Sequence, residues 1–529
     1  MILHCVMARI QVHTQNRRQT TGLGLSADDA FIGLVDYGLF GDKLPPCLTS
    51  EALSDHVPKE LLPLTTESNE TKLKEILKGR NRDFIRYEAL RDVNIPRQMG
   101  VPHPESHIVQ SLALKRHWEK IKKHCAKPKI PVSRLFARKI SGKRIFQMNY
   151  KGIERFEKEE ADIHTMTGSH YIVRTDISKC FPSIYTHSIP WALHGRSKSK
   201  KNHSLSLPGN LLDKATQNTR DGQTNGLLIG PHSSNVISEI ILTQIDHEIL
   251  KKGYDGFSRT IDDYTFYART RAEAESFIRD LVMQLREYEL TLNERKTDIR
   301  PMPVPMEEDW VRELNSFQFP NKEKISFTPV RSFLDFALKL AHGSETSAVL
   351  NYAIKMVPKN INSRAQRLFV QHVVNLAVRY PYLAPLLDEH VFAKHSHDGI
   401  EKVIREFIDE LLAIGLQRVY PDAIAHALYY ALKYGLQFNT TEDKLQEIIA
   451  IDDCVSMVLL REYAKRHRIK SIRDAIRERA NKLKGMDSRE QERFWLLIYQ
   501  VWREKTLRDE SQTFLADLKR ERFNFVHFP

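Results

Sequence analysis

The spacing of hydrophobic and polar positions predicts a mixed start to the chain. Apolar residues recur at helical spacing over residues 69–92 and again over about 105–124, which predicts a helix in each stretch. Between them, residues 94–104 hold three prolines. They favour an extended path, because proline restricts both its own backbone and that of the residue before it. Residues 144–150 alternate apolar and polar side chains, as a strand does.

The next part of the chain, residues 171–300, combines short strands with helices. A run of β-branched and apolar residues over 171–177 is typical of a strand and reaches Asp176 near its end. A second run is interrupted by Asp262 and Asp263, as at the tip of a hairpin. Helical spacing follows a glycine-rich turn, with Ser233 or Ser234 as the N-cap, and returns over residues 272–288. This mixture predicts an α+β domain.

Beyond the proline-rich residues 301–305 the pattern changes to amphipathic helix. Nearly all of residues 332–523 shows helical spacing, in segments such as 364–379, 399–413, 421–434 and 490–503. We expect an all-α C-terminal domain. Its helices could pair as HEAT-like hairpins, although the residues themselves show no repeat.

Three aspartates are the strongest candidates for chemistry. A single aspartate is more often a turn residue or a helix cap. Asp176 at a strand end and Asp262–Asp263 at a hairpin tip, with a glycine turn and a helix between them, favour one converging site. Carboxylate oxygens suit Mg²⁺, and two such ions promote phosphoryl transfer. We therefore expect these aspartates to be catalytic ligands of two Mg²⁺ ions, with Mn²⁺ as the alternative. Ile177, beside Asp176, joins them as a predicted metal and nucleotide ligand.

Further residues are candidates for contacts with a nucleotide. Phe181 follows Asp176 by five positions, where its ring would lie beneath the sugar and exclude a 2′-hydroxyl; a core phenylalanine is the alternative. Gly230 ends a glycine turn that lets the backbone approach a base pair closely. Lys296 could neutralise or protonate pyrophosphate, and a surface lysine is nearly as good an interpretation.

The positive net charge of the chain indicates that one of its partners is a polyanion. The chain has 80 Lys and Arg against 67 Asp and Glu, a net charge of +13. Residues 112–155 alone hold fourteen basic residues against two glutamates. Such a cluster favours nucleic acid, because neutralised phosphates release counterions; a solvated helix face is the plainer interpretation. Within it, Lys143 and Arg144 are the candidates for gripping a triphosphate, in competition with Arg138 and Lys139.

Other features bear on the compartment. The sequence has no apolar run of about 18 residues, so we expect no membrane span. The N-terminus lacks the pattern of a signal peptide. Five scattered cysteines without C-x-x-C spacing favour reduced thiols in a cytoplasm over a structural zinc site.

Four motifs resemble those of reverse transcriptases. Residues 176–185 resemble motif A, 226–234 with Glu239 and Asp246 motif B, 259–264 motif C and 292–297 motif D. The match is closest to the prokaryotic abortive-infection and defence-associated group. Two departures stand out: the usual Tyr-x-Asp-Asp begins here with Thr260, and the Pro-Gln-Gly of motif B appears as Leu228-Ile-Gly230.

The resemblance implies an α+β right-hand polymerase followed by a helical C-terminal domain. Residues 1–68 would form an N-terminal segment, 69–165 the fingers with the basic segment, 166–305 the palm with motifs A to D, and 306–529 the all-helical domain. It implies an RNA-directed DNA polymerase that uses dNTPs in bacterial antiphage defence, in the bacterial cytoplasm.

Partners also follow from the resemblance. Some members of this group copy an RNA template, which can be a dedicated non-coding RNA, and others make DNA without a template. Some attach nascent DNA covalently to the protein, and several form homo-oligomers. Three alternatives stay open: a retron- or intron-type enzyme, an RNA polymerase for which Phe181 is the discriminator, and an RNA-binding scaffold with an idle site.

Overall fold

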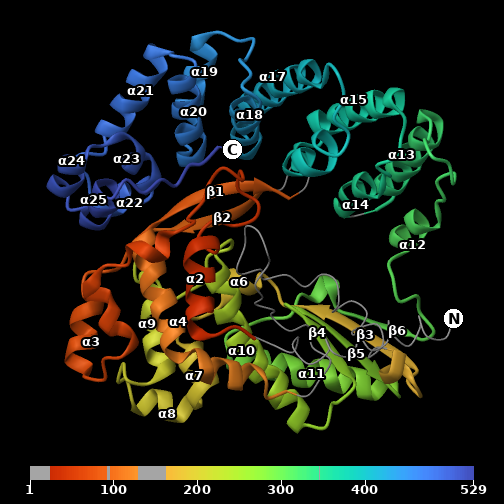
Figure 1. Ribbon diagram of the computed structural model, residues 1–529. Helices are drawn as coiled ribbons and strands as arrows, with labels where there is room; N and C mark the ends of the chain where they lie inside the picture. Colours follow the sequence, from red (N-terminus) through yellow and green to blue (C-terminus); the bar gives the residue numbers. More distant parts are fainter. Residues whose placement is uncertain (1–23, 92–95, 129–162, 345, 529) are drawn as a thin grey trace, which may run out of the picture. The chain divides into compact units, whose positions relative to one another are not determined.

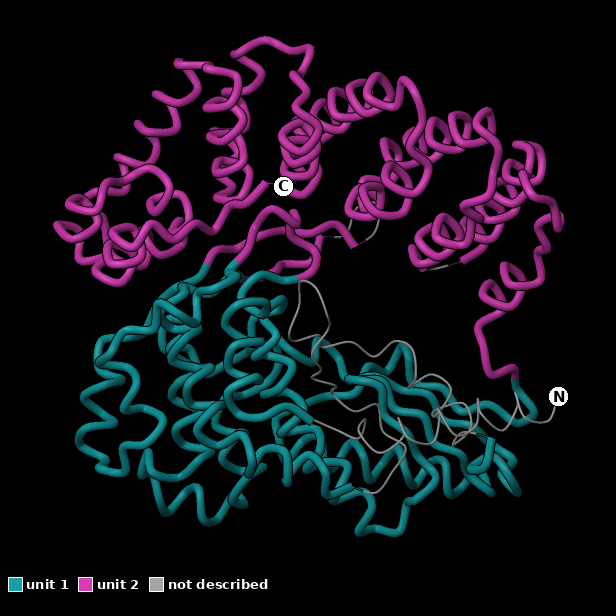
Figure 2. Tube along the Cα trace, viewed as in Figure 1, with its two compact units in different colours: residues 1–41, 50–84, 101–304 teal, residues 42–49, 85–100, 305–529 magenta. Residues whose placement is uncertain are grey.

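The computed structural model describes residues 24–91, 96–128, 163–344 and 346–528. They divide into two compact units, coloured separately in Figure 2. Unit 1 comprises residues 1–41, 50–84 and 101–304, and unit 2 comprises residues 42–49, 85–100 and 305–529. The four-segment division expected from the sequence stays a prediction.

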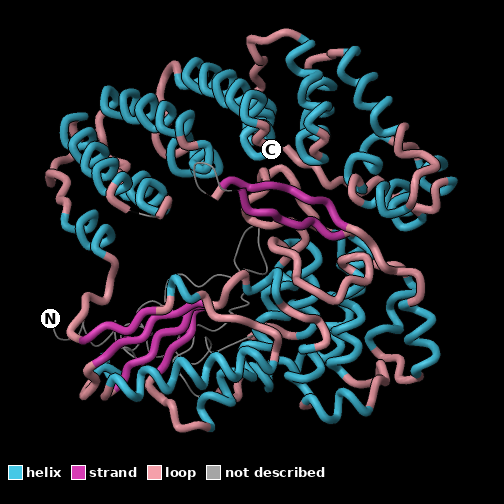
Figure 3. Tube along the Cα trace, turned by 180° about the vertical axis from the view of Figure 1, so that it is seen from behind, coloured by secondary structure: helices cyan, strands magenta, loops and turns pink. Residues whose placement is uncertain are grey.

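A four-stranded sheet lies at the centre of the candidate site in unit 1. Its strands run in the order β4 (Phe257–Thr260), β5 (Asp263–Ala268), β3 (Tyr171–Asp176) and β6 (Asp298–Pro301). All neighbouring strands are antiparallel, and Figure 3 shows them in magenta. The strand predicted to reach Asp176 and the hairpin predicted around Asp262 and Asp263 are both present.

Aromatic packing fixes one face of this sheet against α11 (Arg271–Glu287), which lies along it in Figure 1. Phe266 of β5 stacks on Phe277 of α11 with ring centroids 4.2 Å apart. Phe257 of β4 packs on the same ring at 5.9 Å. Burying such rings removes large apolar areas from water, so the sheet and α11 form one core.

The remaining helices of unit 1 form a second group that includes α4 (Pro104–Cys125). They are α2 (Ala27–Tyr37), α3 (Glu70–Leu77), α6 (Cys180–Ser183), α7 (Ser188–His194), α8 (Arg196–Lys201), α9 (Pro208–Asn218) and α10 (His232–Lys251), with the 3₁₀ turns Leu53–His56, Lys59–Thr65 and Glu294–Lys296. Two buried imidazoles fasten α4 to its neighbours. His107 Nε2 lies 2.8 Å from the Leu34 carbonyl of α2, and His124 Nε2 lies 2.8 Å from the Ile240 carbonyl of α10.

The helix predicted over residues 69–92 is wrong in its second half. α3 ends at Leu77, and Gly79 then adopts φ +69°, a conformation that glycine reaches without strain. Residues 84–90 form strand β1 (Phe84–Leu90), paired with β2 (Pro96–Pro102). The burial of β1 is close to alternating. The extended segment predicted for the prolines is observed as β2.

Unit 2 is predominantly helical, which confirms the helical C-terminal region. Its helices are α12 (Asp309–Ser316), α13 (Phe327–His342), α14 (Ala348–Met356), α15 (Ser363–Arg379), α16 (Ala384–Leu387), α17 (Ile400–Arg418), α18 (Pro421–Tyr434), α19 (Glu442–Ile451), α20 (Cys454–Arg466), α21 (Lys470–Asn481), α22 (Ser488–Glu492), α23 (Trp495–Val501), α24 (Glu504–Asp509) and α25 (Thr513–Arg520), with a 3₁₀ turn at Pro381–Leu383 and a π turn at Asp388–Phe392.

Asp422 in the first turn of α18 accepts hydrogen bonds from the Tyr87 hydroxyl at 2.7 Å and the Leu90 amide at 2.9 Å. These bonds hold β1 to the helices of unit 2.

One predicted helix of this region is interrupted. The single helix expected over 490–503 is divided between α22 and α23, because Phe494 leaves the helical region with φ −121° and ψ 25°. Among the residues that the structure describes, no helix combines the length and the apolarity needed to cross a membrane.

Candidate active site

The three predicted aspartates lie at one end of the β3–β5 pair. Asp176 ends β3 and is the register partner of Asp263, which begins β5. The Ile177 amide donates to the Asp262 carbonyl at 3.2 Å. Residues directly opposite each other in antiparallel strands have Cβ atoms about 4.5–5.5 Å apart. The fold therefore brings together carboxylates that are far apart in sequence.

Their surroundings differ in a way that suits a cation. Asp263 is exposed, whereas Asp176 is only 7% exposed. Asp176 Oδ1 is buried and has no hydrogen-bond partner among the residues that the structure describes, and Oδ2 accepts from Lys296 Nζ at 2.5 Å. A buried carboxylate oxygen without a donor is costly. A positive charge beside it would remove that cost, and the Lys296 ammonium already supplies one to the neighbouring oxygen.

The donors fit a hard divalent ion such as Mg²⁺. Carboxylate and carbonyl oxygens are its preferred protein ligands. Asp176, Asp262 and Asp263 offer the former, and Ile177 offers a main-chain carbonyl. In the described part of the chain, no three His, Cys, Asp or Glu side chains are grouped closely enough to hold an ion as they stand. The fit therefore rests on the donor chemistry and on the unpartnered oxygen of Asp176.

The turn that carries Asp262 is strained. Thr260 pairs with Asp263, so Ile261 and Asp262 form a two-residue hairpin loop. Ile261 adopts φ +59°, which is unfavourable for a β-branched side chain and costs on the order of 1–3 kcal/mol. Such a conformation persists only where the surrounding structure enforces it, and here a buried arginine does so.

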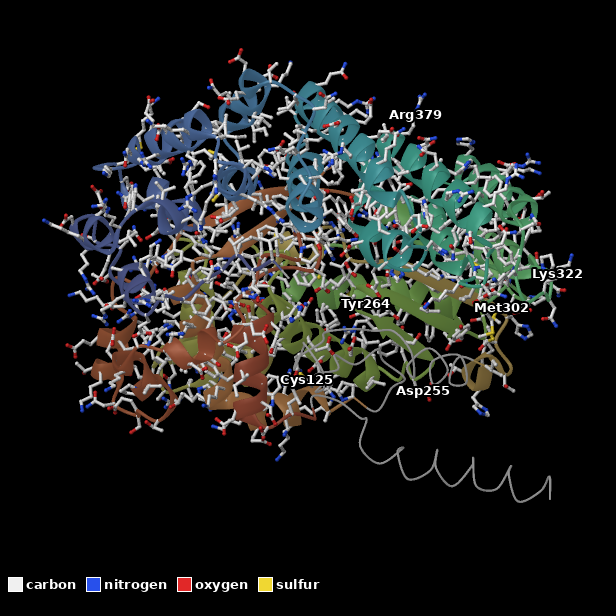
Figure 4. The ribbon with its side chains drawn as sticks, turned by 45° about the horizontal axis from the view of Figure 1, so that its top comes forward. Cys125, Asp255, Tyr264, Met302, Lys322 and Arg379 are labelled. Carbon is white, nitrogen blue, oxygen red and sulfur yellow. The ribbon has the colours of Figure 1, made fainter. Side chains whose placement is uncertain are left out.

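Arg259 connects this turn to the motif B helix. Its side chain is fully buried, and its Nη1 donates to the Ile261 carbonyl at 2.7 Å. The same guanidinium binds Asp246 at 2.8 Å and Glu239 at 3.0 Å, both on α10. Tyr264, labelled in Figure 4, donates to Asp246 at 3.0 Å. Every charge in this group therefore has a partner.

The charge state of Arg259 follows from these contacts. Burial alone lowers the pKa of a guanidinium, but the two carboxylates outweigh it and hold the pKa of Arg259 well above its usual value. The sequence analysis assigned no role to this residue. A usable signal was present: Glu239 and Asp246 are seven residues apart on a helix whose other buried positions are mostly apolar, and such acids need a cationic partner.

Motif A and motif B are joined through their backbones. The Leu227 amide donates to the Phe181 carbonyl, and the Gly226 amide to the Ile184 carbonyl, each at 2.7 Å. Gly226 has φ +86°, and a Cβ there would lie 2.8 Å from the Pro182 carbonyl oxygen. Glycine is therefore required at this position. Phe181 is half-buried.

The start of the motif B helix differs from the prediction. Gly230 adopts φ +129°, and α10 begins at His232 after Pro231, without a side-chain cap. Ser233 and Ser234 lie inside the first turn, so neither is the N-cap. The His232 amide is instead satisfied by the Gly38 carbonyl at 3.0 Å, which replaces the serine cap.

Motif D is held against the end of β3. The Asn293 amide donates to the Asp176 carbonyl at 2.9 Å, and the Ser178 amide to the Thr291 carbonyl at 2.8 Å. Lys296 follows in the 3₁₀ turn with its side chain 58% exposed. The backbone thus positions Lys296 beside Asp176 and leaves more than half of its side chain exposed to solvent.

Lys143 and Arg144 lie outside the described residues, as do Arg138 and Lys139. Their contact with a triphosphate stays a prediction.

The sequence of residues 133–327 matches a family model described as "Reverse transcriptase (RNA-dependent DNA polymerase)". This segment contains the aspartates, Phe181, Arg259 and Lys296. The match confirms the resemblance at the level of the domain family. No protein of curated function is similar enough in sequence to match the chain.

Solved structures of yeast telomerases are similar to the chain at low identity. A telomerase from Candida tropicalis truncated from its C-terminal domain has 11% identity and a TM-score of 0.30, over 43% of this chain and 52% of that one. The apo telomerase of the same organism has 10% identity and a TM-score of 0.33, over 79% and 70%. Telomerase from Candida albicans, in complex with a fragment of telomeric RNA, has 13% identity and a TM-score of 0.28, over 79% and 65%. The chain spans about half the length of the first of these.

Proposed function

We propose that this chain, whose residues 133–327 form a reverse transcriptase domain, is an RNA-directed DNA polymerase that adds dNTPs to a 3′-type hydroxyl. The observation that carries the proposal is the pairing of Asp176 with Asp263 in the β3–β5 register. With Asp262 on the adjoining turn, it supports a site of converging carboxylates. If the chain only bound nucleic acid, neither this arrangement of carboxylates nor the unpartnered oxygen of Asp176 would have a chemical role.

In the proposed reaction the 3′-hydroxyl gives up its proton to water, and its oxygen forms a bond to the α-phosphorus of a dNTP. The bond between that phosphorus and the bridging oxygen breaks, and pyrophosphate leaves with the electron pair. Two divalent ions, Mg²⁺ or Mn²⁺, supply the activation of the hydroxyl and the neutralisation of phosphate charge. Asp176, Asp262 and Asp263 would hold these ions, together with the Ile177 carbonyl.

Three further residues take roles in the proposal. The Lys296 ammonium leaves Asp176 and binds the departing pyrophosphate, whose charge it neutralises. The exposed side chain of Lys296 and its place next to Asp176 support this role. Phe181 lies beneath the sugar and excludes a 2′-hydroxyl. Its anchored backbone and half-buried side chain, close to Asp176 in sequence, support that role. Gly230 gives the backbone close access to the base pair.

The biological setting is also part of the proposal. We place the enzyme in bacterial antiphage defence, in the bacterial cytoplasm, and expect it to be a homo-oligomer that copies RNA. Two specific forms of this proposal can be tested: a dedicated non-coding RNA as the template, and covalent attachment of the nascent DNA to the protein. The motif resemblance to abortive-infection reverse transcriptases supports this setting. A HEAT-like array of the unit 2 helices belongs to the same proposal and is supported by the two-residue connection between α17 and α18.

The activity is tested by DNA synthesis with purified protein, Mg²⁺ and labelled dNTPs. Asp262→Ala with Asp263→Ala should abolish incorporation. The matched control is Asp255→Asn, an exposed aspartate labelled in Figure 4 that precedes β4, and it should retain full activity. Protease and RNase treatment of the product, with sequencing of co-purified RNA, identifies primer and template. Synthesis that survives loss of both aspartates would sink the proposal.

The defence role has a separate test. Cells that carry the gene should form fewer phage plaques than cells that carry the Asp262→Ala, Asp263→Ala variant. Equal plaque counts with an active enzyme would reject the setting and leave the polymerase activity intact.

A further inference from the structure

Unit 1 contains a cavity of about 730 Å³ that the proposed reaction does not use. It lies among α3, α7, α8 and α9, which gather at one end of unit 1 in Figure 1. The residues proposed for the polymerase site do not line it, and these are Asp176, Asp262, Asp263, Phe181 and Lys296. Its size is within the range of small-molecule sites, about 300–1,000 Å³.

One wall of the cavity offers a flat stacking surface. Trp191 of α7 is half-buried and lines the cavity beside Pro190, Leu77 and Leu205. Tyr185 packs on the indole in a T-shaped arrangement with ring centroids 5.7 Å apart, and the Arg196 guanidinium lies over the indole at 4.6 Å from the ring centroid. Because Arg196 covers one face of the indole, a nucleobase would stack on the opposite face, beside the apolar side chains that line the cavity.

The other walls are cationic. Lys74, Lys78, Lys200 and Lys214 all line the cavity. Lys74 is paired with Glu70 at 2.7 Å, and Lys214 reaches only the amide oxygen of Asn81 at 3.4 Å. Neither Lys78 nor Lys200 is paired with a carboxylate among the residues that the structure describes. Within the described part of the chain, the positive charge of Lys78, Lys200 and Lys214 is therefore not balanced by a paired carboxylate.

The one carboxylate among the lining residues is already engaged. Asp213 is buried, lies 2.5 Å from His187 Nδ1 and accepts from the Gln217 amide at 2.7 Å. The hydrogen bond to Asp213 raises the pKa of His187, which favours a further positive charge at the rim. An anion entering the cavity would thus meet ammonium groups and no competing free carboxylate.

We propose that this cavity is a second nucleotide-binding site, in which a nucleobase stacks on Trp191 while its phosphate is held by Lys78, Lys200 and Lys214. An apolar aromatic wall beside uncompensated lysines matches a base joined to a phosphate better than it matches an acidic peptide. The bound unit is a free nucleotide or one nucleotide of a single strand. The site does not depend on the proposed polymerase activity.

The test is photo-cross-linking of the full chain with two probes, 4-thio-UTP and a single-stranded RNA of about 12 nucleotides that carries one 4-thiouridine. The chain carries Asp262→Ala and Asp263→Ala, so that no synthesis occurs and failure of one proposal is distinguishable from failure of the other. Mass spectrometry should locate cross-links on α7, α8 or α9. Whichever probe reacts identifies the source of the nucleotide.

Matched variants decide the outcome. Lys78→Ala, Lys200→Ala and Lys214→Ala together should weaken binding at the cavity by about tenfold. The control removes three exposed lysines of the same helices that do not line the cavity, Lys72, Lys198 and Lys201. Trp191→Leu should reduce the cross-link, and Trp191→Phe should retain it. Absence of cross-links on these helices with both probes, or equal losses in the cavity and control variants, would overturn the proposal.

Discussion

Among single residues, Arg259 has a large expected effect on stability. Arg259→Ala would leave Glu239 and Asp246 buried without their cation. Breaking a buried ion pair in this way costs about 3–5 kcal/mol. We expect a corresponding fall in the free energy of unfolding, measured by urea denaturation.

Arg259→Lys separates charge from geometry. Lysine keeps the positive charge but cannot bind both carboxylates and the Ile261 carbonyl as the guanidinium fork does. It should lose less stability than Arg259→Ala and still lose most of the activity, because the turn that carries Asp262 is no longer held. Wild-type activity in Arg259→Lys would show that the arginine does not position the turn.

Sugar selection is a second prediction at this scale. Phe181→Ala removes the ring proposed to exclude a 2′-hydroxyl, so incorporation of rNTPs relative to dNTPs should rise. Phe181→Tyr keeps the ring and should keep the preference. Competition between labelled rNTPs and dNTPs measures the ratio. An unchanged ratio in Phe181→Ala would return this residue to a purely structural role.

The role of a residue could be predicted when the signal for it lies in the neighbouring sequence. Asp176, Asp262 and Asp263 stand at a strand end and a hairpin tip, which local pattern reveals. The acids of α10 signal that a buried cation is needed, but they do not say that Arg259 supplies it or that it also binds the Ile261 carbonyl, because these contacts join residues that are distant in sequence.

At the scale of elements, the histidines of α4 make the packing of unit 1 sensitive to acid. Burial lowers the pKa values of His107 and His124 to about 4, against 6.5 for an ordinary histidine. Below pH 6.5 the unfolded chain binds protons that the folded chain refuses, so stability falls as the pH decreases from 6.5 towards 4. The loss approaches about 3 kcal/mol for each histidine, at about 1.4 kcal/mol per pKa unit.

Urea unfolding at pH 7.5, 6 and 5 measures this dependence. The double variant His107→Gln, His124→Gln retains amide donors for the Leu34 and Ile240 carbonyls and cannot titrate. Its stability should decline less between pH 6.5 and 5 than that of the unchanged chain. Identical pH profiles would contradict the assignment.

Helices and strands were predicted correctly where one hydrophobic period dominates the sequence, and wrongly where contacts with residues distant in sequence determine the structure. Residues 364–379 and 421–434 carry clear helical spacing and are helices α15 and α18. Residues 84–90 also carry apolar side chains at helical spacing, yet pairing with β2 and the bonds to Asp422 select a strand. Those partners are distant in sequence, so periodicity alone could not identify them.

Across the whole molecule, the net charge of +13 predicts that binding of single-stranded RNA depends on salt. Each phosphate neutralised releases counterions, so the logarithm of the affinity should fall linearly with the logarithm of salt concentration. Fluorescence anisotropy with a labelled RNA at several salt concentrations gives the slope. A flat response would show that the basic residues do not contact phosphate.

The three-way contact of Arg259 also has a consequence for the evolution of the chain. Glu239, Asp246 and Arg259 are all buried, so exchanging Arg259 for an uncharged residue leaves two carboxylates without a cation, whereas losing both acids leaves the guanidinium without a counterion. The arginine and its acids should therefore be inherited together. Descendants of the same ancestral enzyme are expected to keep at least one of the two acids wherever they keep the arginine, and lineages that keep an acid without the arginine should be rare because their intermediates fold poorly.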